Sequence, residues 1–265
     1  MPTILDRIHQ ALSAQRCNKE IFEGKIAATH LIEALTVPSA SYSFNYERLE
    51  FIGDTFLKLM ATAYVFAEEI ESQEGLLHNA RREIIMNRTL LKHCMDHKLN
   101  DFMLLQSFTS RAWVPPNFVN PSGGRATTHP ISGPRGEGYL PTAYHSKGLV
   151  QQKTLADLAE SAMGAGLMTE GMDGALHVAR CLNITPRPIH SLGETAELYR
   201  QKTSEAIRRE KLDSAIDPQA LFELEGFLGY TFRSPHIALQ ATTHQSINLT
   251  GMTFSYEVRP TIRAT

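Results

Sequence analysis

Apolar side chains recur at intervals of three and four residues in several segments, which is the pattern of amphipathic helices. The longest such segment is predicted to run from about residue 44 to about residue 71. Further helices are predicted over shorter stretches. The chain is therefore expected to be built mainly of helices, with residues 44–71 as the central one. The apolar positions of that helix that are predicted to supply core are Leu49, Ile52, Phe56, Leu59 and Met60.

The other predicted helices share the same spacing and lie on both sides of one long interruption. Between about residues 107 and 151 the pattern lapses, and prolines and glycines such as Pro115, Pro116 and Gly123 punctuate the chain. A structureless stretch of this length is unusual inside a compact domain, so it is predicted to be an irregular insertion. The remaining helices are expected at residues 4–12, with Ile4, Leu5, Ile8 and Leu12 on one side, and at 25–36, 76–97, 153–168, 172–182 and 193–210.

Acidic side chains mark two of these helices. Glu47, Glu50 and Asp54 are separated by three and four residues, so they lie along one stripe of the central helix. Asp157 and Glu160 are three residues apart in the helix at 153–168. Like charges at this spacing repel unless a cation neutralises them. One interpretation is a solvated acidic face. The other is that the two helices converge on a divalent metal, for which carboxylate oxygens suit Mg²⁺ or Mn²⁺.

Three segments carry a family resemblance, and they occur in order along the chain. Residues 47–54 resemble the signature of the ribonuclease III domain, residues 75–90 resemble its middle helix, and residues 153–165 resemble its second acidic motif. The resemblance is to the first ribonuclease III domain of Dicer-like proteins of the fungal type. It implies an all-α, ribonuclease III-type helical bundle that acts as an endonuclease on double-stranded RNA.

A second, partial resemblance follows near the end of the chain. Residues 221–232, 239–246 and 255–257 resemble the opening of another ribonuclease III domain, and the sequence departs from it after Glu257. The expected organisation is a ribonuclease III domain at 1–184, a connecting helix and linker at 185–216, and the truncated start of a second domain at 217–265.

The resemblance implies a role for four acids. Glu50, Asp54, Asp157 and Glu160 are expected to be the catalytic, metal-binding quartet, holding Mg²⁺ or Mn²⁺. Glu47 is expected to support them. For Glu47 an ion pair, with Arg48 for example, is the alternative.

Other residues are expected to assist. Asn87 is expected to support the metal site through water or by holding a carboxylate, and Lys153 either faces the site or is a surface lysine. Basic residues of the middle helix could contact RNA phosphates without reading the sequence, or could form a solvated face. The basic residues singled out for RNA binding are Arg81, Arg82 and Arg88.

Composition and charge limit the class of protein and its expected location in the cell. The formal net charge is −2 and the pI is about 6.6, which argues against a dedicated basic RNA-binding module. No apolar run approaches the ~20 residues of a membrane span, and the first residues lack the features of a signal peptide. The three cysteines form no zinc or disulfide pattern. An intracellular location, cytoplasmic or nuclear, is therefore expected.

The combined expectation is a divalent-metal-dependent endoribonuclease that cleaves double-stranded RNA as part of a Dicer-like RNA-silencing enzyme. Its partners would be double-stranded RNA and either a second copy or another ribonuclease III domain. The pairing surface is expected around Phe51, Ile52 and Phe56. The alternative is a catalytically impaired fragment that serves as a dimerisation or RNA-binding partner.

Overall fold

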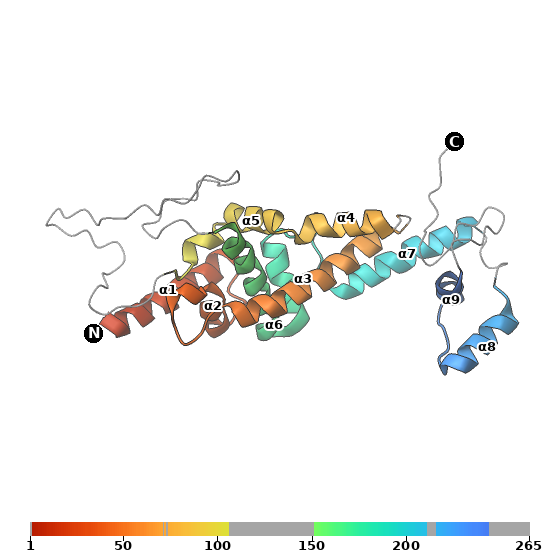
Figure 1. Ribbon diagram of the computed structural model, residues 1–265, viewed down its shortest axis with the longest axis horizontal. Coiled ribbons are helices and arrows are strands. Elements are labelled where there is room, and N and C mark those ends of the chain that lie inside the picture. The colour runs from red at the N-terminus through yellow and green to blue at the C-terminus, as the bar shows by residue number, and fades with distance from the viewer. Residues whose placement is uncertain (1, 71, 73, 106–150, 211–215, 244–265) are drawn as a thin grey trace. The chain divides into compact units, whose positions relative to one another are not determined.

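The computed structural model of the chain describes residues 2–70, 72, 74–105, 151–210 and 216–243 (Figure 1). The described residues are predominantly helical and form no strand, so the prediction of an all-α protein is confirmed. The helices are α1 (Pro2–Ile21), α2 (Ala28–Leu35), η1 (Pro38–Ala40), α3 (Glu47–Glu68), α4 (Glu74–Ile85), α5 (Asn87–Asp96), η2 (Leu99–Phe102), α6 (Gln152–Cys181), α7 (Leu192–Glu210), α8 (Pro218–Leu228) and α9 (Pro235–Thr242).

The helices belong to two compact units. The first unit takes the described residues of 1–59 and 84–191, and the second takes those of 60–83 and 192–265. Helix α3 contributes its N-terminal part to the first unit and its C-terminal part to the second. The three-part division expected from the sequence stays a prediction. The expected insertion at about 107–151, apart from Gln151, and the end of the expected second domain after residue 243 lie outside the described residues.

Helix α6 is the centre of the first unit. It lies against α2 and α5 (Figure 1), and every residue from Leu155 to Gly166 is buried. A helix that is buried on all sides needs small residues wherever a neighbouring helix approaches. This segment supplies them, because alanine and glycine alternate with larger apolar residues. The fully buried large side chains of α6 are Leu155, Leu158, Met163 and Leu176.

A sharp break interrupts α6 where the sequence predicted one. Glu170 and Gly171 have non-helical dihedral angles, and Gly171 has a φ of +66°, which glycine adopts without steric cost. On either side of the break the chain approaches itself closely. A Cβ atom added to Gly166 or to Gly174 would collide with the main chain of the other.

The crossing of α3 and α6 depends on two further glycines. A Cβ atom on Gly53 would overlap the main-chain oxygen of Glu160, and one on Gly164 would overlap that of Leu49. The two backbones are therefore in direct contact here, a distance that only glycine permits. This contact brings the first turns of α3 beside the segment of α6 that carries Asp157.

Two helix predictions were wrong in extent. The single helix expected over residues 76–97 is two helices, because Met86 has an extended backbone (φ −71°, ψ 142°) between α4 and α5. The helix expected over residues 4–12 continues to Ile21. Its predicted apolar side is exposed in the described structure, and the buried side instead carries Asp6, Gln10, Ala14 and Cys17. Hydrogen bonds from Gln10 Nε2 (2.7 Å) and Tyr42 Oη (3.0 Å) satisfy the buried Asp6 carboxylate.

The face that the central helix α3 buries differs in part from the face that the sequence predicted. Leu49, Phe56 and Met60 are core residues as predicted, but Leu59 is 51% exposed. Phe56, which was expected at the pairing surface, is 3% exposed, whereas Phe51 is 74% exposed. The expected pairing surface therefore cannot include the Phe56 side chain.

The second unit joins the end of α3 to α7. The rings of Phe66 and Tyr199 stack with centroids 5.0 Å apart, and Lys202 Nζ lies 2.9 Å from a Glu68 carboxylate oxygen. In α8, by contrast, the described residues include no buried side chain, and Phe227 is 87% exposed. Among the described helices, none is both long and apolar enough to cross a membrane.

Candidate active site

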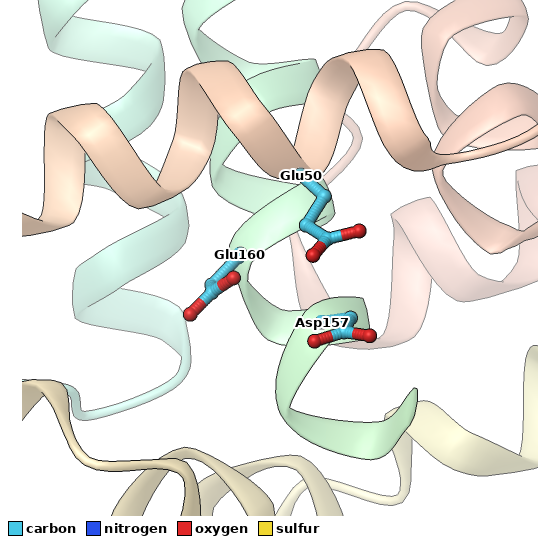
Figure 2. A group of neighbouring side chains, drawn as sticks. All are labelled: Glu50, Asp157 and Glu160. Carbon is cyan, nitrogen blue, oxygen red and sulfur yellow. The ribbon is translucent and has the colours of Figure 1, made fainter. Parts of the chain in front are cut away.

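Three carboxylates from two helices meet in the first unit. Glu50 comes from α3, and Asp157 and Glu160 come from α6 (Figure 2). One oxygen from each lies within 4.8 Å of the others. Glu50 is half-buried, whereas Asp157 and Glu160 are buried. The sequence separates the two sides of this cluster by about a hundred residues, so the fold alone brings them together.

Local structure explains why these side chains point the same way. The Asn45 side chain accepts a hydrogen bond from the Glu47 amide (3.0 Å), and the Tyr46 carbonyl accepts one from the Glu50 amide (2.8 Å). These bonds start α3 so that Glu50 lies in its first turn. Asp157 and Glu160, three residues apart on α6, share one helical face. The glycine crossing of α3 and α6 then sets these acids opposite each other.

Burial and mutual repulsion perturb the acids of the cluster. Burial, followed by the charges of Asp54, Asp157 and Glu50, raises the pKa of Glu160 to about 8. Burial and the charge of Asp157 also raise the pKa of Glu50, while Lys153 opposes that change. A carboxylate whose pKa is raised in this way gains most from a nearby cation. Perturbed carboxyl groups of this kind are typical of functional sites.

Lys153 faces the cluster from one turn before Asp157. Its Nζ lies 3.1 Å from Asp157 Oδ2 and 3.7 Å from Glu50 Oε1, so it bridges the two helices. Hydrogen bonding to Asp157 raises the pKa of Lys153, and the lysine remains charged. Because this side chain is 67% exposed, solvent screens the ion pair. Lys153 is therefore an exposed lysine whose Nζ lies beside the acids, and its role there stays a prediction.

Tyr46 is a contact that sequence reasoning did not single out. Its ring is buried, and its hydroxyl donates to Asp157 Oδ2 at 3.3 Å. Burial and the charges of Asp157 and Glu50 raise the pKa of this phenol above its ordinary value. The only signal in the sequence is its place directly before the acidic helix, and a tyrosine there is not distinctive by itself.

Asp54 and Glu47 have other partners. Asp54 Oδ2 lies 2.7 Å from Lys58 Nζ on the same helix. Asp54 is not in the group of oxygens within 4.8 Å, although its charge contributes to the raised pKa of Glu160. The Glu47 carboxylate accepts a hydrogen bond from Asn45 Nδ2 at 3.0 Å. The structure thus gathers three of the four acids of the expected quartet.

The expected supporting and basic residues are dispersed. Asn87 and Arg88 are exposed at the start of α5 in the first unit. Arg82 is exposed on α4, and Arg81 is half-buried and donates to Thr62 Oγ1 at 3.4 Å; both belong to the second unit. Their roles toward metal or RNA stay predictions.

The donor set of the cluster fits a hard divalent cation. Glu50, Asp157 and Glu160 offer carboxylate oxygens only, and their repulsion is relieved when a cation binds between them. The described site offers no sulfur or imidazole ligand among these three residues, which disfavours a soft metal.

The three acids lie inside a segment that is similar to a known domain. Residues 47–171 match the family profile described as the ribonuclease III domain. The chain is 28% identical over 263 residues to Dicer-like protein 2 from Aspergillus oryzae, covering 97% of this chain and 17% of that protein. It is 26% identical over 263 residues to Endoribonuclease Dicer homolog 2b from Oryza sativa subsp. japonica, covering 97% and 18%. The chain therefore spans about one sixth of the length of these relatives.

A solved structure is also similar. The crystal structure of the nuclease domain of ribonuclease III from Campylobacter jejuni aligns with a TM-score of 0.44 and 23% sequence identity. The alignment covers 66% of this chain and 95% of that chain.

Proposed function

Because the chain contains a ribonuclease III-type endoribonuclease domain similar to those of Dicer-like proteins, we propose that it cleaves double-stranded RNA with the help of a divalent metal. The observation that carries this proposal is the meeting of Glu50, Asp157 and Glu160 within 4.8 Å inside the matched segment. We place the chain in RNA processing of the Dicer-like kind, in the cytoplasm or the nucleus.

The cluster would hold Mg²⁺ or Mn²⁺ through Glu50, Asp157 and Glu160. When bound, such an ion supplies an activated water and positive charge at the scissile phosphate. The Tyr46 hydroxyl donates a hydrogen bond to Asp157 Oδ2 at 3.3 Å. The positive charge of Lys153 lies beside Glu50 and Asp157, where it can stabilise negative charge that develops on the phosphate. Asp54 would join the ligands either through Oδ1 or by exchanging the contact of Oδ2 with Lys58.

Contact with RNA is proposed at exposed basic residues. Arg82 on α4 and Arg88 on α5 are exposed, and Arg81 precedes Arg82 by one position. Such contacts neutralise phosphates regardless of sequence. Replacing either exposed arginine with alanine should therefore weaken binding equally for unrelated duplexes.

Pairing with a second ribonuclease III domain, in another copy or another chain, is proposed through the exposed side of α3. Phe51 and Leu59 are exposed there and offer apolar area. The same observation favours the second candidate function, in which the chain is a non-catalytic partner that contributes its surface to another protein.

Cleavage of labelled RNA by the full chain tests the proposal. Wild type with Mg²⁺ should cut both strands of a long duplex and spare single-stranded RNA of the same sequence. The Glu160→Gln variant should be inactive while keeping its helical circular dichroism spectrum. Cleavage that persists in this variant or in excess chelator would refute the catalytic assignment. Duplex binding without cleavage in wild type would favour the partner function.

A further inference from the structure

Tyr46 touches both helices that form the acidic cluster. Its main-chain carbonyl accepts the Glu50 amide at 2.8 Å, and its side-chain hydroxyl reaches Asp157 Oδ2 at 3.3 Å. Its own amide donates to the Thr36 carbonyl at 2.9 Å, which fixes the residue to the end of α2. One buried residue therefore connects the first turn of α3 to an acid that is 111 residues further along the chain.

The two hydrogen-bond donors to Asp157, Lys153 and Tyr46, differ in how firmly they are held. The Lys153 side chain is 67% exposed and extends through solvent to the acids. Tyr46 is 5% exposed, and its ring is enclosed by the protein. The phenol donates this hydrogen bond and the Asp157 carboxylate oxygen accepts it. The Tyr46 hydroxyl thus holds Asp157 in one orientation, even when Lys153 moves away.

We propose that Tyr46 is a positioning residue for the metal site, acting through Asp157. Its hydroxyl occupies one lone pair of Oδ2 and so orients the carboxylate, with the other lone pairs of Asp157 directed toward Glu50 and Glu160. This inference rests on the proposed metal-binding function of the cluster. Partners that orient a ligand commonly change metal affinity by about 10- to 100-fold when they are lost. The 3.3 Å separation is long for an O–H···O bond, so the lower end is expected.

The chain contains a matched control for this residue. Tyr42 Oη donates to Asp6 Oδ2 at 3.0 Å, and Asp6 is a buried acid of α1 outside the cluster. Tyr42→Phe and Tyr46→Phe each remove one hydroxyl that donates to a buried aspartate. The Tyr42 bond is the shorter one, so its loss should reduce stability at least as much.

Calorimetric titration of the full chain with Mn²⁺ alone, without RNA, tests the inference. Tyr46→Phe should weaken Mn²⁺ binding about tenfold, whereas Tyr42→Phe should leave it unchanged. In urea unfolding with chelator, Tyr42→Phe should lose at least as much stability as Tyr46→Phe. Equal Mn²⁺ affinity in Tyr46→Phe and wild type would overturn the role of Tyr46. Wild type that binds no Mn²⁺ would instead overturn the proposed metal site itself.

A double-mutant cycle identifies the route of the effect. If Tyr46 acts through Asp157, then adding Tyr46→Phe to Asp157→Asn should cause no further loss of Mn²⁺ affinity. RNA cleavage by Tyr46→Phe should recover at high Mn²⁺, since only the concentration of bound metal has changed. Independent, additive losses in the cycle would mean that Tyr46 does not work through Asp157.

Discussion

Replacing Glu160 with glutamine should stabilise the metal-free protein at pH 8 and have little effect at pH 4. The substitution keeps the shape of the side chain and removes its charge. In the folded chain the pKa of Glu160 is about 8, compared with an ordinary value of 4.5, because the side chain is buried and surrounded by acids. The folded state therefore resists an ionisation that the unfolded state permits.

The size of the effect follows from that difference. One unit of pKa difference corresponds to about 1.36 kcal/mol, so ionising Glu160 costs the folded state at most about 5 kcal/mol above pH 8. Relaxation of the neighbouring acids and Lys153 reduces this cost, and burying an amide has a cost of its own. We expect a net gain of about 2 kcal/mol in the free energy of unfolding.

The dependence on pH has a definite sign. Below pH 4.5 Glu160 is protonated in both states, so the substitution removes no charge. Between pH 4.5 and about 8 the unfolded state of wild type ionises while the folded state does not, and wild type loses stability relative to the variant. Above pH 8 the difference levels off. Groups that are distant from Glu160 contribute equally in both proteins and cancel.

Urea unfolding in chelator, followed by circular dichroism at pH 4 and pH 8, measures this difference. Glu205→Gln is the control, because Glu205 is an exposed carboxylate of α7, and its replacement should change stability by less than about 0.5 kcal/mol. Excess Mg²⁺ should reverse the ranking, since it stabilises only the protein with an intact site. A variant that is no more stable than wild type at pH 8, or equally stabilised at pH 4, would refute the electrostatic reasoning.

Three further predictions concern residues around the site. Gly53→Ala should destabilise the first unit by about 3 kcal/mol or more in urea unfolding, because its methyl group overlaps the Glu160 main chain, whereas Gly75→Ala in α4 meets nothing and should be neutral or stabilising. Lys153→Met should tighten Mn²⁺ binding a few-fold and yet slow RNA cleavage, because it removes a cation that competes with the metal; weaker Mn²⁺ binding would contradict this. Phe51→Gln should preserve stability and reduce self-association in sedimentation experiments; unchanged association would exclude this face.

The sequence named three acids that the fold brings together, and it missed much of what surrounds them. Spacing placed Glu50 on one helix and Asp157 with Glu160 on another, and the resemblance paired the helices. The sequence could not show that Asp54 contacts Lys58, because a lysine four residues after an acid is equally compatible with a free carboxylate. Tyr46 was missed because its contact with Asp157 exists only in the folded chain.

The wrong predictions about the fold have a similar cause. Phe51 and Phe56 are five residues apart, so on a helix they point about 140° from each other, and apolarity alone does not tell which one is buried. The break at Met86 carries no glycine or proline signal. The apolar residues of α1 favoured burial of the wrong side, because the buried Asp6 carboxylate accepts hydrogen bonds from Gln10 and from Tyr42, which is distant in sequence.

The glycine crossing of α3 and α6 has a consequence for how this protein can vary. Gly53 and Gly164 place main chain against main chain, so the separation of the acids is set by the backbones and not by the side chains that fill the core. Substitutions among the surrounding leucines and methionines can repack without changing that separation. The separation of the acids therefore tolerates substitutions in the core, whereas a single methyl group added at either glycine would change it.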